Sequence, residues 1–150
     1  MPTVQSTYTT QSAARVGMIA SGEDMSVLIS GTVETAAGVG FGVAVQFGAT
    51  NDGVKAVGDG SATAYRGVTV RDLSRNASGN VNGFEQYSTA RLMLKGVIYV
   101  TAPAAITRGQ AAYYDAAGVI TNVSTSNTAI PNAYFDESAA SGALVKLRLN

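Results

Sequence analysis

Apolar and polar residues alternate along much of this chain. From Met25 to Glu34, the odd positions carry Met, Val, Ile, Gly and Val, while most even positions carry Ser, Thr or Glu. The same period of two recurs in residues 41–47, 92–100 and 145–149. Because successive side chains of a strand point to opposite faces of a sheet, these segments predict strands with one face on a core. In 92–100 the pattern places Leu92 and Leu94 on the buried face and Met93 on the other.

Shorter segments of the same character complete the pattern. They comprise residues 17–20, 65–71, 111–115, 119–123 and 129–135. Gly-containing turns such as Asp52-Gly53 and Asn82-Gly83 separate many of these segments. No window of the sequence has a sustained apolar stripe of helical spacing, and the best helical candidate is a single turn within 136–143. The sequence therefore predicts an all-β, single-domain fold: a β-sandwich or a jelly-roll-like small barrel.

Two segments depart from the strand pattern. Residues 1–14 are rich in Thr, Ser and Gln and nearly free of charge, which predicts an extended N-terminal arm before an all-β domain of residues 15–150. Residues 71–87 predict a long polar loop, and loops of that length in compact domains are usually functional or mobile. We therefore take the arm and the loop as candidate interfaces, with these residues as candidates: Thr3, Val4, Thr7, Tyr8 and Arg15 in the arm, and Arg71, Arg75, Phe84 and Tyr87 in the loop.

The side chains that most small enzymes depend on are absent from the composition. The chain has no Cys and no His, so the usual zinc, copper and iron–sulfur ligands and the Ser-His and Cys-His nucleophile pairs are missing. A glycoside hydrolase needs only two carboxyl groups about 5–10 Å apart. Its candidates here are Glu23, Asp24, Glu85, Asp136 and Glu137, all in predicted turns or loops. We predict that the protein is not an enzyme and binds no cofactor, and keep the hydrolase as an alternative.

Charge narrows the expected partners. Ten basic and ten acidic residues give a net charge of zero, and no cationic stripe of the kind that binds nucleic acid is present. The first eighteen residues carry one charge, Arg15, and no apolar block, and no apolar run approaches the roughly 20 residues of a spanning helix. We expect no nucleic-acid partner and no membrane. Charged residues make up only 13% of the chain, and such a surface favours association with other proteins.

The order of the β segments carries a family resemblance over nearly the whole chain. It runs from MPTVQSTYTT through GMIASGE, VLISGTVE, VGFGVAVQFG, YRGVTVRD and LKGVIYV to RGQAAYYDAAGVIT and IPNAYFDESAASGALVKLRLN. The most distinctive part is the block near 109–120 followed by a last strand that alternates basic and apolar residues. In this order the chain resembles the structural cement (capsid decoration, head-stabilising) proteins of tailed bacteriophages.

The resemblance implies a location as well as a fold. It implies a protein of the virion that self-associates, as a dimer or trimer, and binds the major capsid protein on the outer surface of an icosahedral capsid. There it would stabilise the shell across the seams between capsomers, with no catalytic motif and no cofactor. The basic faces at Arg91/Lys95 and Lys146/Arg148 would then meet an acidic capsid surface. The alternative is a carbohydrate- or receptor-binding β-module of the virion that uses exposed tyrosines such as Tyr8, Tyr87 and Tyr99.

Overall fold

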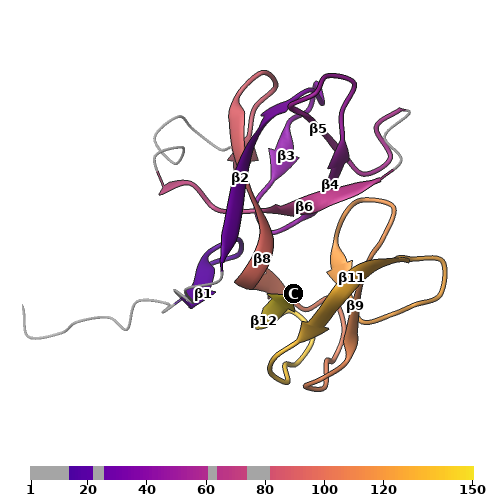
Figure 1. The fold of residues 1–150 in the computed structure, drawn as a ribbon. Helices are drawn as coiled ribbons and strands as arrows, with labels where there is room; N and C mark the ends of the chain where they lie inside the picture. The colour runs from indigo at the N-terminus through magenta and orange to yellow at the C-terminus, as the bar shows by residue number, and fades with distance from the viewer. Residues whose placement is uncertain (1–13, 22–25, 61–63, 74–81) are drawn as a thin grey trace, which may run out of the picture.

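The computed structural model describes residues 14–21, 26–60, 64–73 and 82–150, and these residues contain strands and turns but no α-helix (Figure 1). None of them, accordingly, forms a helix long and apolar enough to cross a membrane. The described residues form twelve strands: β1 Ile19–Ser21, β2 Val27–Val33, β3 Val39–Gly40, β4 Ala44–Phe47, β5 Gly53–Ala56, β6 Tyr65–Thr69, β7 Gly83–Phe84, β8 Thr89–Thr101, β9 Ala111–Tyr114, β10 Ile120–Thr121, β11 Thr128–Phe135 and β12 Leu144–Leu149.

Five strands close into a small barrel. β8 pairs with β2, β2 with β5, β5 with β4, β4 with β6, and β6 pairs back onto β8. Only the β2–β5 pair is parallel in this ring. Closure of the ring leaves no free edge among these strands. One apolar cluster belongs to the barrel and its β3–β7 end, and it comprises Val33, Val39, Phe41, Val45, Val54, Phe84, Ala90 and Leu92.

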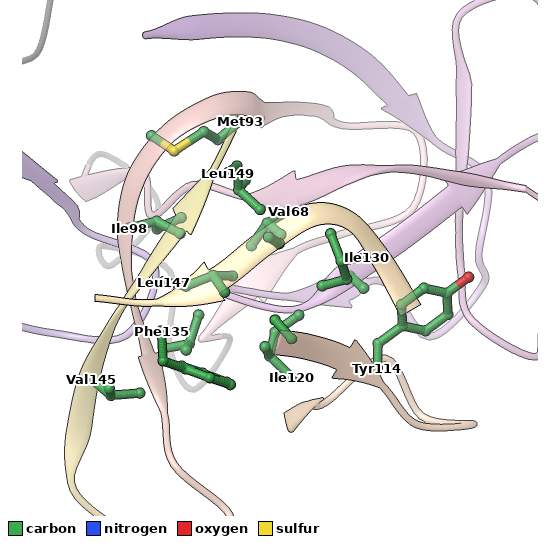
Figure 2. Packing of buried hydrophobic residues seen from close by; sticks show 14 of the residues in the cluster. Val68, Met93, Ile98, Tyr114, Ile120, Ile130, Phe135, Val145, Leu147 and Leu149 are labelled. Atoms are coloured by element: carbon green, nitrogen blue, oxygen red, sulfur yellow. The ribbon is translucent and has the colours of Figure 1, made fainter. Parts of the chain in front are cut away.

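The C-terminal half of the chain adds a second sheet beside the barrel. Its order is β10-β9-β11-β12-β8, and β1 pairs on the other side of β8. The larger apolar cluster joins the two parts, because it contains Val68 and Met93 from barrel strands together with Phe135 and Leu147 from the second sheet (Figure 2). The all-β prediction is confirmed: the fold is a small closed barrel with an added sheet packed against it.

Strand β8 belongs to both parts, and Gly96 is the residue where it passes from one to the other. Lys95 pairs with Val27 in the barrel, whereas Gly96 pairs with Leu149 in the second sheet. The predicted faces of this strand are wrong at two positions, because Met93 is fully buried and Leu94 is 37% exposed. A single alternation cannot describe a strand that has a core on each side.

The structure confirms the hairpin predicted around Asp115 but does not contain the helical turn predicted within residues 136–143. β9 and β10 form an antiparallel hairpin, and Asp115 Oδ1 accepts hydrogen bonds from the backbone N–H groups of Ala117 and Val119, each at 2.9 Å. The expected helical turn within 136–143 is absent. Ala139 instead forms an isolated bridge with Ile106. The predicted loop at 71–87 contains the short strand β7, which pairs with β3.

Candidate interaction surface

Val16 and Gly17, which follow the predicted arm, lie against Arg71 at the start of the predicted loop. Arg71 Nε donates to the carbonyl oxygen of Val16 at 3.0 Å, and the backbone N–H of Arg71 donates to that of Gly17 at 2.7 Å. The Arg71 guanidinium also lies 4.8 Å from the centre of the Phe41 ring, within the range of a cation–π interaction. Burial, and secondly the positive charge of Arg15, lower the pKa of Arg71. Arg71 therefore fastens the beginning of the described chain to the barrel.

The turn between β3 and β4 completes this attachment. The Thr69 hydroxyl donates to the carbonyl oxygen of Gly40 at 2.7 Å and accepts from the N–H of Val43 at 3.1 Å, so both ends of the turn are held. Within the turn, Gly42 has a φ of +69°, and a Cβ placed there would lie 2.6 Å from Val16 Cγ1. Only glycine accommodates both the positive φ and this close approach.

A small apolar pocket adjoins the attachment point. Its volume is about 170 Å³, and its lining is Val16, Phe41, Gly42, Val43, Thr101, Val119 and Ile120. It lies where the barrel meets strand β10, and the N–H of Ala44 donates to the carbonyl oxygen of Gly118 at 2.8 Å to hold the two parts together. β10 is the last strand in the order of the second sheet as described, and both of its residues, Ile120 and Thr121, are buried.

Tyr87 is presented at the tip of the turn that leads into β8. Its side chain is 78% exposed and its φ is 62°. A positive φ is uncommon for a bulky residue and costs about 1–2 kcal/mol relative to right-handed backbone. The turn is nevertheless held, because the Ser88 hydroxyl donates to the Glu85 carbonyl at 2.6 Å and the Gln86 amide donates to the Glu34 carbonyl at 3.1 Å. The result is an exposed aromatic ring on a well-fixed turn.

Phe84 is a core residue and not part of an exposed interface. It is fully buried and meets Phe41 edge to face, with ring centres 5.1 Å apart and an interplanar angle of 86°. Its pairing with Val39 draws it into the barrel cluster, which the polar sequence around it gave no reason to expect. The remaining candidates Thr3, Val4, Thr7, Tyr8 and Arg75 lie outside the described residues, while Arg15, Arg71 and Tyr87 lie within them.

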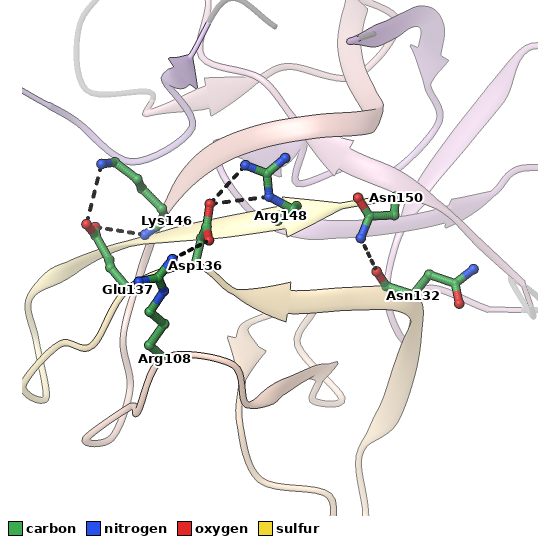
Figure 3. Close-up of polar contacts among 7 residues, drawn as sticks. All are labelled: Arg108, Asn132, Asp136, Glu137, Lys146, Arg148 and Asn150. Atoms are coloured by element: carbon green, nitrogen blue, oxygen red, sulfur yellow. Dashed lines mark hydrogen bonds and ion pairs between the residues drawn. The ribbon is translucent and has the colours of Figure 1, made fainter.

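The expected basic face at Lys146 and Arg148 is neutralised by the protein's own acids (Figure 3). Arg148 Nη2 lies 3.0 Å from Asp136 Oδ2, and Lys146 Nζ lies 3.5 Å from Glu137 Oε2. Arg108 approaches Asp136 from the other side, at 3.9 Å. Lys146 and Arg148 are therefore each paired with a carboxylate of the same chain, which weakens the basic face expected at these two positions.

Glu34 holds the turn between β4 and β5. Its carboxylate accepts hydrogen bonds from the N–H of Ala49 at 2.7 Å, from the hydroxyl of Thr50 at 2.7 Å and from the N–H of Thr50 at 2.9 Å. These bonds, with that from Ala49 the strongest, lower the pKa of Glu34 to about 2. The charged form is thus the form that the folded turn binds.

Glu34→Gln is expected to destabilise the protein at pH 7 but to make little difference in strong acid. A carboxyl group whose pKa is lower in the folded state stabilises that state above its unfolded pKa of about 4.3. The contribution is lost as the pH falls through the folded pKa, here about 2. Thermal unfolding of both proteins between pH 7 and pH 2 measures this, together with amide exchange at Ala49 and Thr50. A difference in midpoint that does not shrink toward pH 2 would contradict the assignment.

Comparison with known proteins places this fold and its sequence in one family. The family model described as Structural cement protein (E217 gp24/Pam3 gp6) matches residues 4–150. A chain from the structure titled "The capsid of Myoviridae Phage XM1" is 17% identical, with a TM-score of 0.76 over 100% of this chain and 98% of that one. The head fiber gp8.5 N base of bacteriophage phi29 is also 17% identical, with a TM-score of 0.52 over 83% of this chain and 95% of that one. Comparison with curated proteins gives no significant match. Because the family model spans almost the whole chain, the protein belongs to the phage structural cement family and is a component of the virion capsid.

Proposed function

We propose that this protein is a non-enzymatic cement protein that binds the outer surface of an icosahedral capsid and stabilises it across the seams between capsomers. The observation that carries the proposal is the family match over residues 4–150. The partner is the major capsid protein, and the protein associates with further copies of itself as a dimer or trimer. The exposed Tyr87 and the firmly attached end of the arm supply surfaces suited to such contacts.

A cement protein strengthens a shell by adding contact area that must be broken before subunits separate. A standard protein interface buries roughly 1,600 Å² in total, and one such contact gives only moderate binding. Linking two or three copies raises the overall avidity by roughly 10²–10⁴-fold over one copy, provided that all can engage together. Self-association is therefore part of the proposed mechanism.

The arm is the proposed bridge to a neighbouring subunit. The pairs Thr3-Val4 and Thr7-Tyr8 are interleaved with the polar residues Gln5 and Ser6, which suits a strand that adds to an exposed sheet edge through main-chain hydrogen bonds. The arm joins the domain next to Arg15, where Arg71 and Gly42 fix the backbone of residues 16–17. Because residues 16–17 are held against the barrel, a force applied to the arm would be transmitted directly to the barrel.

Deletion of residues 2–12 is expected to leave a folded protein that no longer decorates capsids. Residues between 28 and 149 form the two apolar clusters described, so we expect the thermal midpoint to stay close to that of the full chain. Loss of a tethered contact lowers avidity by about 10²-fold or more. Co-sedimentation with undecorated capsids measures binding, and the thermal disruption temperature of the decorated particles measures cementing.

A second variant separates the arm's side chains from its length. Replacing residues 2–12 by a Gly/Ser sequence of equal length keeps the tether and removes its strand-forming side chains, so it should bind as poorly as the deletion. Capsid binding as tight as that of the full chain by both variants would rule out the arm. Absence of decoration by the full chain itself would rule out the cement function.

The exposed Tyr87 also favours a second candidate function, recognition of a carbohydrate or host receptor by the virion. Tyr99 offers less support, because the Lys146 ammonium lies 5.9 Å from the centre of its ring and covers it. A glycan array with the purified protein separates the two functions. Specific glycan binding that Tyr87→Ala abolishes would establish recognition, whereas capsid binding without glycan binding would favour cementing alone.

A further inference from the structure

We infer that the turn formed by residues 85–88 carries the main capsid contact of this protein, and that the Tyr87 ring enters a pocket of the major capsid protein with apolar walls and a basic rim. The inference rests on the proposed cement function and adds to it a contact residue and the chemistry of the receiving surface. Three features support it: the exposure of the ring, the backbone strain beneath it and the hydrogen bonds that hold the turn.

The turn presents an aromatic ring beside a carboxylate. At 78%, Tyr87 has the largest exposed fraction among the exposed large hydrophobic residues of the described chain. Tyrosine is one of the residue types that dominate binding energy at protein interfaces, because its rigid ring gives a large contact area and its hydroxyl a hydrogen bond. Glu85 is exposed in the same turn, and residues 85–88 contain no cation. A complementary partner surface therefore has an apolar pocket for the ring and a Lys or Arg near the carboxylate.

The backbone of Tyr87 has a conformation that a tyrosine rarely adopts. Its φ of 62° lies in the left-handed region, which Gly and Asn tolerate and in which a bulky residue is strained. The other non-glycine residues of the described chain with a positive φ are Ser126 and Asn132, and both have small polar side chains. Asn or Gly at position 87 would fold with less strain. A bulky residue in such a strained position is typical of a binding site.

Hydrogen bonds hold the turn against the barrel before any partner binds. The N–H of Tyr87 donates to the carbonyl oxygen of Val33, a fully buried residue of the barrel cluster, at 2.7 Å. Two further bonds, from the Gln86 amide and the Ser88 hydroxyl, fix the turn on neighbouring carbonyls. Because the turn is already ordered, binding through it does not have to offset the entropy of fixing a loop.

A groove beside the turn enlarges the surface that a partner can contact. It has a volume of about 220 Å³ and is lined by residues 37–40 and 82–84. Three of these residues are glycines, so main chain forms much of its wall. The groove reaches the turn, because a Cβ placed on Gly38 would lie 3.4 Å from the Cα of Glu85. A side chain of the capsid subunit that receives Tyr87 can therefore enter the groove in the same contact.

Tyr87→Asn separates a binding role from a structural one, because we expect it to change stability and binding in opposite directions. Asn relieves the strain, so the thermal midpoint should rise by about 2–4 °C. Affinity for undecorated capsids, measured by co-sedimentation, should fall about thirtyfold or more, the loss typical of a residue that dominates an interface. Unchanged capsid affinity would overturn the inference, and so would a lower thermal midpoint accompanying the loss of binding.

Two control variants test whether the effect belongs to Tyr87. Ser126→Asn relieves strain of the same kind, since Ser126 is exposed and has a φ of 61°, but it removes no ring. Phe47→Ala removes an aromatic ring that is 50% exposed on β4. Both variants should bind capsids within about twofold of the unmodified protein, as residues outside a dominant contact do. A loss of binding in either control equal to that of Tyr87→Asn would overturn the inference.

Photo-cross-linking identifies the partner of the turn directly. The photoreactive amino acid p-benzoylphenylalanine is incorporated at position 87, decorated capsids are irradiated, and the linked peptides are identified by mass spectrometry. We expect links to the major capsid protein, near a Lys or Arg, and several-fold fewer links from the same probe at position 47. Links from position 87 only to a second copy of this chain would overturn the assigned partner.

Capsid binding by the unmodified protein separates failure of this inference from failure of the proposed function. Decoration by the unmodified protein and equal decoration by Tyr87→Asn would keep the cement function and reject the contact. Absence of decoration by the unmodified protein would reject both. Glycan binding that Tyr87→Asn abolishes, with capsid binding unchanged, would assign the ring to receptor recognition and reject the inferred contact.

Discussion

Phe84→Ala is expected to lower the free energy of unfolding by about 3–5 kcal/mol, the usual cost of truncating a buried aromatic side chain. Phe84 is fully buried and packs edge to face on Phe41. Removing its ring leaves a cavity in the barrel cluster and deprives Phe41 of its partner. Since Arg71 stacks on the other ring of this pair, loosening should spread to the point where the arm is attached. Chemical denaturation measures the change in stability.

Two control variants set the scale for this effect. Phe84→Leu keeps much of the apolar volume and should cost less than Phe84→Ala. Phe47→Ala removes the same kind of side chain from a position that is 50% exposed, so it should cost well under half as much. If Phe84→Ala lowered the free energy of unfolding by less than about 1 kcal/mol, the effect would be that expected for substitution of an exposed residue. Such a result would restore Phe84 as a candidate for the interface.

Gly96→Ala is expected to destabilise the protein by about 2–4 kcal/mol, because a positive φ and a close contact act together. Gly96 has a φ of +129°, and a Cβ there would lie 2.8 Å from Ser26 Oγ and 3.2 Å from Met93 Sδ. The residue lies where β8 leaves the barrel and joins the second sheet. A shift at this point therefore disturbs both registers and the apolar cluster between them.

Gly109→Ala is the matched control for backbone strain without crowding. Gly109 has a φ of +88°, and a Cβ there would meet nothing within 4 Å. It should cost about 1–2 kcal/mol, the price of a left-handed conformation alone. Thermal and chemical unfolding of both variants give the comparison. Equal losses of unfolding free energy in the two variants would show that the contacts around Gly96 do not add to the cost of the substitution.

The arm and the loop are the two candidate interfaces that the composition of the sequence predicts. Both depart from the strand pattern, and the structure brings Val16, which follows the arm, against Arg71 at the start of the loop. The pocket beside β10 was not predictable, because its lining comes from segments as distant as Val16, Phe41 and Ile120. No local pattern marks residues that become neighbours only when the barrel and the second sheet pack together.

Several errors have the same origin. Lys146 and Arg148 have the alternation of an exposed basic face, yet Asp136 and Glu137 on the neighbouring chain segment pair with them. Phe84 stands in a polar stretch, and its burial follows from a two-residue pairing with Val39, 45 positions earlier in the chain. Met93 is buried against expectation because β8 has a core on both faces.

The sequence by itself determined the all-β class, most of the longer strands, the hairpin around Asp115 and the lack of Cys and His chemistry. These features depend on the type of each side chain and on the spacing of apolar residues along short segments. Both properties are present in the sequence before the chain folds. Only the tertiary structure decided that five strands close into a barrel, that β8 is shared, and which apolar residues face the pocket beside β10. Those features depend on pairings between distant segments, and such pairings form only when burial of both apolar clusters outweighs the entropy lost in ordering the chain.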